Sequence, residues 1–274
     1  MKLVKNIMTR NPCYTKGKKM TAIKGIMLHS VGCPQPKASV FIRQWNNPGY
    51  SRACVHAFID ATDGTIYQTL PWNYRGWHCG RGCKGSGNQS YIGVEMCEPS
   101  CITYNSGSSF ICTDLQAARD SVSLTYESAV ELFAMLCREY HLDPLANDVI
   151  LSHREGHARG IASNHSDPEH LWTGTGVNYT MDAFRNSVYS LLKNTNKNED
   201  KNTDSRSEFP PLPFKVKVLI KDLNYRASPS MKGIVKGQTG KGIFTITELS
   251  GGWGKLKSGA GWIWLMNPDY CTWR

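Results

Sequence analysis

DVILSHREGHARGIASNHSDPEHLW, residues 148–172, joins a short apolar run to a segment that holds four of the chain's eight histidines. The run from Asp148 to Ser152 has the length and composition of a buried strand, which ends at His153. Glycine and serine interrupt the remainder, which predicts a loop. Imidazoles beside the carboxylates of Glu155 and Asp167 are the ligands that a divalent metal prefers, zinc above all. The alternative is a solvated polar loop with no ligand.

Short apolar runs alternate with helical patterns through the rest of the first 193 residues. An Asp63-Gly64 turn joins two alternating runs and predicts a hairpin. Strands are expected at 25–28, 54–60, 65–70, 91–97 and 148–152, and helices at 37–45, 126–140 and 180–192 with Thr180 as an N-cap. Interleaved strands and helices predict an α/β or α+β sheet with helices packed on it.

Two histidines reach the same edge of this expected sheet. His29 and His153 each stand at the carboxyl end of a predicted strand, where ligands gather in open α/β sheets. With Asp167 they supply two imidazoles and a carboxylate, which leaves a fourth zinc position for water. Glu95 lies in the apolar strand YIGVEMC. Because a buried carboxylate needs a polar partner, we expect it to move protons at the site, unless this strand position is half exposed.

Two other metal motifs are considered. HREGH has Arg154 where a zincin helix needs glutamate, and Gly156 weakens a helix, so the zincin interpretation is rejected. Two C-x3-C pairs leave a structural zinc open, beside the alternative of unpaired thiols: Cys79, Cys83, Cys97 and Cys101.

The chain has 274 residues, a length that favours two domains. The polar, proline-ending segment 194–213 predicts a linker between domains 1–193 and 214–274. No apolar run approaches the roughly 18 residues of a membrane span, so no membrane insertion is expected. The N-terminal MKLVKNIMTRNPCY has no apolar core of a secretory signal, which predicts synthesis in the cytoplasm.

The second domain reads as a small β-barrel of short strands at 215–220, 242–249, 254–256 and 261–265. Residues 214–274 contain ten Lys and Arg against three Asp and Glu. This excess suggests a polyanionic partner such as nucleic acid, an anionic membrane surface or an anionic cell wall. Four tryptophans accompany the charge, which suits carbohydrate or peptide recognition.

Residues 22–172 resemble the zinc-dependent N-acetylmuramoyl-L-alanine amidases of the type-2 family, which includes phage endolysins, bacterial autolysins and animal peptidoglycan-recognition proteins. The resemblance rests on motifs in the family's order: IMLHS, VHAFIDATDGTIYQTLP, RGWHCG, NQSYIGVE, LSHREGH and SNHSDPEHLW. It implies a mixed β-sheet flanked by helices, with zinc in a surface groove.

Matched by position, the resemblance implies that Zn²⁺ is bound by His29, His153 and Asp167. Glu95 matches the acidic residue that activates the zinc water. His165 falls where many members have a catalytic lysine, so it is expected to stabilise the oxyanion. Three further residues are expected to contact substrate: His78, His56 and Trp77.

The sequence departs from the family pattern at two places. The gap between His153 and Asp167 is longer than in compact members, which leaves His157 or His165 open as the third ligand. Val55 stands where some members have a catalytic tyrosine, so Glu95 would act without one.

Residues 214–274 resemble bacterial SH3-like cell-wall-binding domains, through LNYRASPS at 223–230 and GGWGKLKSGAGWIWL at 251–265. Together the resemblances imply a hydrolase of the Gram-positive cell wall that cuts the amide between N-acetylmuramic acid and L-alanine in peptidoglycan. A phage or prophage endolysin is expected, released to the wall without a signal peptide. The alternatives are a sporulation or autolysis amidase of the bacterium and a peptidoglycan-binding protein without catalysis. A nucleic-acid partner is not expected, because no Arg-rich or groove-reading motif is present.

Overall fold

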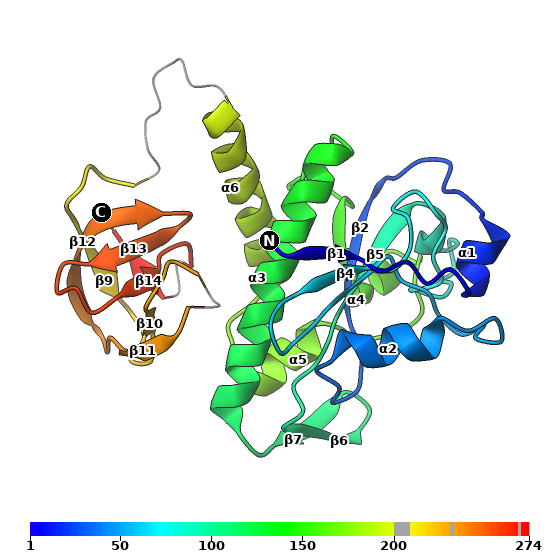
Figure 1. Cartoon of the computed structure of the whole chain (residues 1–274), viewed down its shortest axis with the longest axis horizontal. Coiled ribbons are helices and arrows are strands. Elements are labelled where there is room, and N and C mark those ends of the chain that lie inside the picture. The colour runs from blue at the N-terminus through cyan, green and yellow to red at the C-terminus, as the bar shows by residue number, and fades with distance from the viewer. Residues whose placement is uncertain (200–208, 231–232, 268–269, 274) are drawn as a thin grey trace. The chain divides into compact units, whose positions relative to one another are not determined.

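The computed structural model describes residues 1–199, 209–230, 233–267 and 270–273. The chain divides into two compact units, Met1–Tyr189 and Ser190–Arg274 (Figure 1). The last helix of the first unit, α6, spans Met181–Glu199 and so continues six residues into the predicted linker. Among the described helices, none is both long enough and apolar enough to cross a bilayer.

The first unit is built on one mixed β-sheet, as predicted. Its order is β1-β4-β3-β5-β2-β8, in which β3 and β4 pair antiparallel and the other neighbours pair parallel. The strands are β1 (Leu3–Lys5), β2 (Gly25–Ser30), β3 (Ala57–Ile59), β4 (Ile66–Gln68), β5 (Tyr91–Met96) and β8 (Ile150–Ser152). The helices are α1 (Pro12–Lys16), α2 (Ala38–Trp45), α3 (Leu115–Glu139), α4 (His153–Ala158), α5 (Glu169–Thr175) and α6, with a 3-10 turn at Gly87–Gln89 and a separate hairpin of β6 (Ile102–Ser106) and β7 (Ser109–Cys112).

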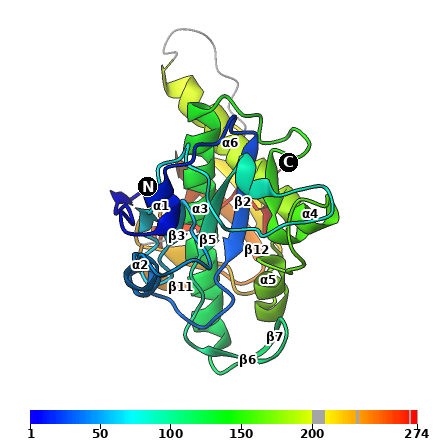
Figure 2. The same ribbon diagram turned by 90° about the vertical axis from the view of Figure 1, so that its right-hand side faces the viewer.

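Strand β2, an interior strand between β5 and β8, shows why this sheet forms. All six of its residues are buried, as expected for a parallel strand covered on both faces. Figure 2 shows β2 beside β5, with α1 and α2 on one side and α4 and α5 on the other. The predicted hairpin over 54–70 is confirmed as β3 and β4. Its turn places Gly64 at a φ of +67°, where a side chain would be strained.

The long helix α3 covers one part of the sheet. The expected apolar positions Tyr126 and Phe133 are buried, and Phe133 meets Phe184 of α6 edge to face at 5.0 Å. The helix begins eleven residues before the predicted start, capped by Asp114, whose carboxylate accepts the Ala117 N–H. The predicted cap of α6 is confirmed, since the Thr180 hydroxyl accepts the Ala183 N–H.

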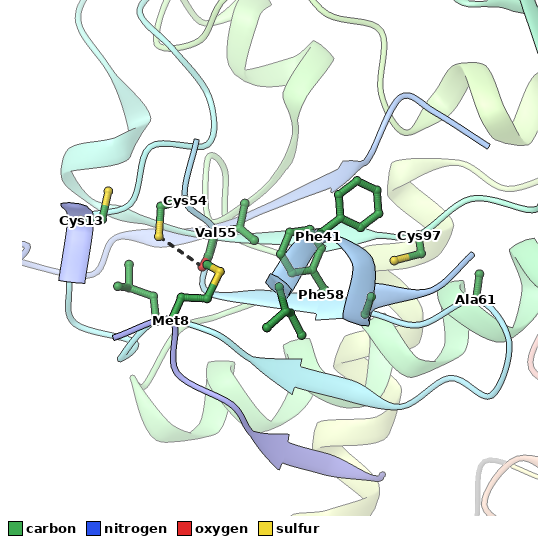
Figure 3. Packing of buried hydrophobic residues seen from close by; sticks show 11 residues of the cluster. Met8, Cys13, Phe41, Cys54, Val55, Phe58, Ala61 and Cys97 are labelled. Atoms are coloured by element: carbon green, nitrogen blue, oxygen red, sulfur yellow. Dashed lines mark hydrogen bonds between the residues drawn. The ribbon is translucent and has the colours of Figure 1, made fainter. Parts of the chain in front are cut away.

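A second apolar cluster joins α1 and α2 to the sheet (Figure 3). Phe41 of α2 stacks on Phe58 of β3, with ring centroids 5.3 Å apart. Cys13 of α1 and Cys54 lie in the same cluster and fix the short helix against the body of the unit. The N-terminal segment is therefore part of the folded unit.

The stretch after His153 differs from the predicted loop, because it contains α4 and α5. Helix α4 is stabilised by a capping box: the Ser152 hydroxyl accepts the Glu155 N–H at 3.0 Å, and the Glu155 carboxylate accepts the Ser152 N–H at 3.1 Å. These two bonds outweigh the low helix propensity of Gly156. Arg185 donates two hydrogen bonds to Glu155, so this carboxylate is structural.

The second unit is a small β domain. Its seven-stranded sheet has the order β11-β10-β14-β13-β12-β9-β15. The strands are β9 (Phe214–Val218), β10 (Asn224–Arg226), β11 (Val235–Gln238), β12 (Gly242–Ser250), β13 (Trp253–Leu256), β14 (Trp262–Trp264) and β15 (Cys271–Thr272). Strand β9 alternates buried and exposed residues, so that Val216 enters the core while Lys215 and Lys217 face solvent.

Candidate metal centre

Three neighbouring strands bring the candidate residues together at their carboxyl ends. In the register of β2 and β5, His29 is the partner of Glu95. Because residues paired across parallel strands project to the same face, these two side chains share one face of the sheet. Leu28 of β2 pairs with Ser152 of β8, so His153 arrives one position later, opposite His29. Asp167 reaches the same point from the segment before α5.

The three predicted ligands converge on one point. His29 Nδ1 lies 3.0 Å from His153 Nδ1 and 3.2 Å from Asp167 Oδ2, and His153 Nδ1 lies 3.4 Å from Asp167 Oδ1. All three side chains are buried. Among the described residues, this is the one group of histidine, cysteine and acidic side chains close enough to hold a metal ion.

A chain of hydrogen bonds fixes which nitrogen of His29 carries the proton. Burial, followed by the charges of His29 and His56, lowers the pKa of His78 well below its ordinary value, so His78 is neutral. Its Nε2 lies 3.0 Å from the Tyr91 carbonyl, which only accepts, so Nε2 carries the proton. Its Nδ1 therefore accepts from His29 Nε2 at 3.0 Å, which leaves the lone pair of His29 Nδ1 free.

His153 is oriented in the same way by Ser163. The Ser163 hydroxyl donates to the Cys79 carbonyl, so its oxygen accepts from His153 Nε2 at 3.2 Å. In the neutral tautomer that this bond selects, the lone pair of His153 Nδ1 also points into the cluster. Metal-binding histidines have this arrangement, in which the outer nitrogen donates to a protein acceptor and the inner one is bare.

The donor set fits zinc. Two bare nitrogens and a carboxylate within 3.4 Å repel one another unless a cation lies between them. Zinc bonds of about 2.0–2.1 Å in a tetrahedron would set neighbouring ligand atoms about 3.3 Å apart, close to the separations found here.

The protonation states at the cluster also suit a metal. Burial lowers the pKa of His29 to about 4, against the opposing hydrogen bond with Asp167. Burial acts to raise the pKa of Asp167, but hydrogen bonds with His153 and His29 hold it well below its ordinary value. At neutral pH, His29 is therefore neutral and Asp167 ionised, the states in which both bind a metal.

Glu95 lies beside this cluster and is half-buried, as the alternative prediction allowed, but its carboxyl oxygen Oε2 is buried. Its Oε2 has no hydrogen-bond partner in the described structure. Burial, and then the charges of Asp167 and Glu98, raise the pKa of Glu95 well above its ordinary value. A perturbed carboxyl group next to a metal-binding cluster is typical of a group that exchanges protons.

The other predicted site residues fall in different places. His165 stacks on the His153 ring at 4.5 Å, and its side chain is 61% exposed, so it lies at the surface beside the cluster. His56 is fully buried: its Nε2 donates to the Tyr74 carbonyl, and its Nδ1 accepts the Gly93 N–H. His78 lies behind His29, packed over Gly93, where an added Cβ would be 2.3 Å from its ring.

These placements bear on the predicted substrate contacts. Trp77 is partly exposed and remains a candidate. His56 and His78 have both ring nitrogens bonded within the protein. These bonds give both residues positioning roles and do not support the predicted contact with substrate.

The possible structural zinc at the four cysteines is not supported. Cys79 lies in an apolar cluster with Met27, whereas Cys97 lies in another with Phe58. Cys83 is exposed, and Cys101 precedes the β6–β7 hairpin. The sequence spacing pairs these thiols, but the fold separates them.

A buried network near the site was not foreseen. Tyr104 of β6 donates to Glu98 at 2.7 Å, and His170 of α5 lies 2.7 Å from the same hydroxyl. Glu98 also accepts the Gly32 N–H, and burial raises its pKa to about 7. The network thus fastens the hairpin and α5 to the loop that follows β2.

Comparison with known proteins identifies the family. A model of the N-acetylmuramoyl-L-alanine amidase family matches residues 19–170, more than half of the chain. The chain therefore belongs to this family of type-2 amidases.

Individual relatives match over shorter segments. The amidase CwlH of Bacillus subtilis is 46% identical over 52 residues, which cover 19% of this chain and 20% of CwlH. The amidase CwlA of the same bacterium is 30% identical over 97 residues, 35% of this chain and 34% of CwlA. The chain thus spans about a third or less of the length of these relatives.

A solved structure supports the fold. The hydrolase AmiA of Staphylococcus aureus, solved in complex with its ligand, aligns with a TM-score of 0.51 and 21% identity, over 71% of this chain and 86% of that one. At this identity the likeness concerns the fold alone.

Proposed function

We propose that this protein is a zinc-dependent N-acetylmuramoyl-L-alanine amidase that hydrolyses the amide between the lactyl group of N-acetylmuramic acid and L-alanine in peptidoglycan. The observation that supports this most directly is the convergence of two bare imidazole nitrogens and a carboxylate beside Glu95, in a chain of the amidase family. His29, His153 and Asp167 would hold the metal.

Each side chain has a distinct task in this proposal. When bound, zinc supplies Lewis acidity for the scissile carbonyl and for water. Glu95 takes the proton of the attacking water and returns it to the nitrogen of the leaving L-alanine. His165, exposed beside the cluster, donates a hydrogen bond to the developing oxyanion. His78 and Ser163 keep the proton-bearing nitrogens of the two ligands turned outward.

The products of a defined substrate test the proposal. Incubation of the full chain with a soluble N-acetylmuramoyl-L-alanyl peptide should release a peptide with a free L-alanine amine and muramic acid with a free lactyl carboxylate, both identified by mass spectrometry. A chelator should stop the reaction, and added Zn²⁺ should restore it. Cleavage between amino acids, or new reducing ends of sugars, would identify another hydrolase.

Substitution of His78 tests whether this residue positions His29. His78→Leu removes the acceptor for His29 Nε2, so zinc affinity should fall roughly 10- to 100-fold. His78→Asn keeps an acceptor oxygen and should recover most of the affinity, which a purely steric role would not allow. Competition with a fluorescent chelator measures both values. Equal zinc affinity of His78→Leu and the wild type would refute a positioning role for His78.

We propose that residues 214–274 form an SH3-like module that holds the enzyme on the Gram-positive cell wall. Lys215 and Lys217 face solvent on β9, which gives this unit a basic exterior. A catalytic unit joined to a wall-binding unit suits a phage or prophage endolysin that is made in the cytoplasm and acts after release. An amidase used by the bacterium in sporulation or autolysis is the second candidate.

Deletion of residues 214–274 tests whether amide cleavage and wall binding belong to different parts of the chain. The shortened chain should cleave the soluble muramoyl peptide at a similar rate but sediment far less with purified walls. Sedimentation equal to that of the full chain would exclude a wall-binding role for this unit.

A further inference from the structure

The basic residues of the first unit are segregated along the chain. Residues 1–59 contain ten Lys and Arg and no Asp or Glu, and residues 64–94 add three more with no acid. The two acidic residues between these segments already have partners within the unit: Asp60 is buried and accepts the Ala38 N–H, and Asp63 pairs with Lys2. The modest net charge of the whole unit conceals this division.

These cations are available to a partner. All ten Lys and Arg of residues 1–59 are exposed. Within the described part of the chain, Lys2 is the only one of the ten that makes an ion pair. Positive charge without compensating acids lowers the local concentration of cations and raises that of anions.

Part of this charge is gathered with aromatic rings around α1. We call the exposed side chains of Lys16, Lys18 and Lys19 and the half-buried side chain of Arg75, with the neighbouring rings, the α1 basic surface. Lys16 Nζ lies 5.1 Å from the centre of the Trp77 ring, and Lys19 Nζ lies 3.2 Å from the centre of the Tyr74 ring. Tyr74 stacks on Tyr14 of α1 at 5.7 Å.

Backbone hydrogen bonds make this surface rigid. The Arg75 N–H donates to the Lys18 carbonyl at 2.8 Å, which joins the segment after α1 to the segment before Trp77. Trp77 is paired with Cys54 by two reciprocal bonds of 2.9 and 2.8 Å. The cations therefore project from a hydrogen-bonded backbone.

The α1 basic surface is also adjacent to the candidate metal centre along the chain. Trp77 is followed directly by His78, whose Nδ1 accepts from the ligand His29. The single residue His78 thus links Trp77 of this surface to His29 of the centre. A ligand that binds here is expected to be attached to the substrate itself.

We propose that the α1 basic surface binds an anionic polyol-phosphate polymer linked to the peptidoglycan that the enzyme cleaves. Most of these cations are lysines, which act as mobile point charges, and they are spread along a surface. That distribution suits a flexible chain of repeating phosphodiesters, whereas a single carboxylate would favour convergent, bidentate arginines. This inference rests on the proposed amidase function, because that function brings the surface to the wall.

The test compares two full-length variants with equal loss of charge. Lys16→Gln, Lys18→Gln and Lys19→Gln are combined in one, and Arg43→Gln, Arg138→Gln and Lys193→Gln, all exposed cations outside both this surface and residues 214–274, in the other. Binding is measured to purified walls with their phosphate polymer intact and to the same walls after its chemical removal, across a salt series. Thermal unfolding confirms that both variants are folded.

The first variant should bind intact walls roughly 10- to 50-fold more weakly than the wild type, with a shallower dependence on salt, because three phosphate contacts are lost. The control variant should bind like the wild type, and the wild type should lose affinity when the polymer is removed. Equal binding of both variants would overturn the proposal, and so would wild-type binding that is unchanged by removal of the polymer.

Two further measurements keep the conclusions separate. Loss of binding to duplex DNA in the first variant, with unchanged wall binding, would assign the surface to nucleic acid and overturn the proposal. Cleavage of the soluble muramoyl peptide, which has no phosphate polymer, is measured with the wild type. Failure of that cleavage would refute the amidase function, whatever the wall-binding result.

Discussion

Asp167→Ala is expected to abolish amide hydrolysis and to strip zinc from the chain. Asp167 is buried, and its two oxygens lie 3.2 Å from His29 Nδ1 and 3.4 Å from His153 Nδ1. Its loss removes the only negative charge among the three ligands. The fall in zinc affinity should exceed the roughly 10- to 100-fold that loss of an outer partner costs. Metal analysis after dialysis, with product release from the soluble muramoyl peptide, measures both effects.

The same segment provides a matched control. His157 is exposed, and its Nδ1 bonds to the Ala162 carbonyl, away from the cluster. His157→Ala should therefore keep both zinc and activity. His165→Ala should keep zinc but lose part of the activity. If Asp167→Ala retains its zinc while His157→Ala or His165→Ala loses it, the third ligand has been wrongly assigned.

Glu95→Gln is expected to lower kcat by roughly 10²–10⁴-fold, the usual contribution of a general acid or base, and to leave zinc content unchanged. Glutamine keeps the size of the side chain but cannot exchange a proton. Because Glu95 must lose its proton before it can accept one from water, the wild-type rate should rise with pH along its acid limb. In Glu95→Gln that limb should disappear.

Glu98→Gln is the corresponding control. Glu98 is also a buried carboxyl group, with a pKa raised to about 7 by burial, but it is bonded to Tyr104 and Gly32. An amide there preserves acceptance from the Gly32 N–H, so hydrolysis should change far less than in Glu95→Gln. Similar losses in the two variants would indicate that Glu95 acts through general electrostatics and not as the proton carrier.

The convergence of the candidate metal-binding residues could be predicted because their positions follow from strand ends. The apolar run before His29 and the run before His153 each specify a buried strand, and parallel strands align their carboxyl ends. Asp167 could be predicted as well, because it is a carboxylate in the same histidine-rich segment. The mixed sheet flanked by helices followed from the interleaving of strands and helices and from the family resemblance.

The remaining features depend on contacts between distant segments. The proton positions on the histidines are set by the Tyr91 carbonyl and by Ser163, which no spacing rule connects to His29 or His153. Tyr104 and His170 meet only because the β6–β7 hairpin packs against α5. Helix α4 is an exception: Ser152 and Glu155 have capping-box spacing, a signal that was present in the sequence and missed.

The strand pairing of β2 makes insertions and deletions unequal in their effects. Side chains alternate between faces along a strand, so one extra residue within β2 would turn His29 away from Glu95 and His153. The segment between Gly160 and Asp167 lies outside the sheet and can change in length without altering any register. Related chains should therefore differ in the spacing of their last two ligands, while the spacing from β2 to its histidine stays constant.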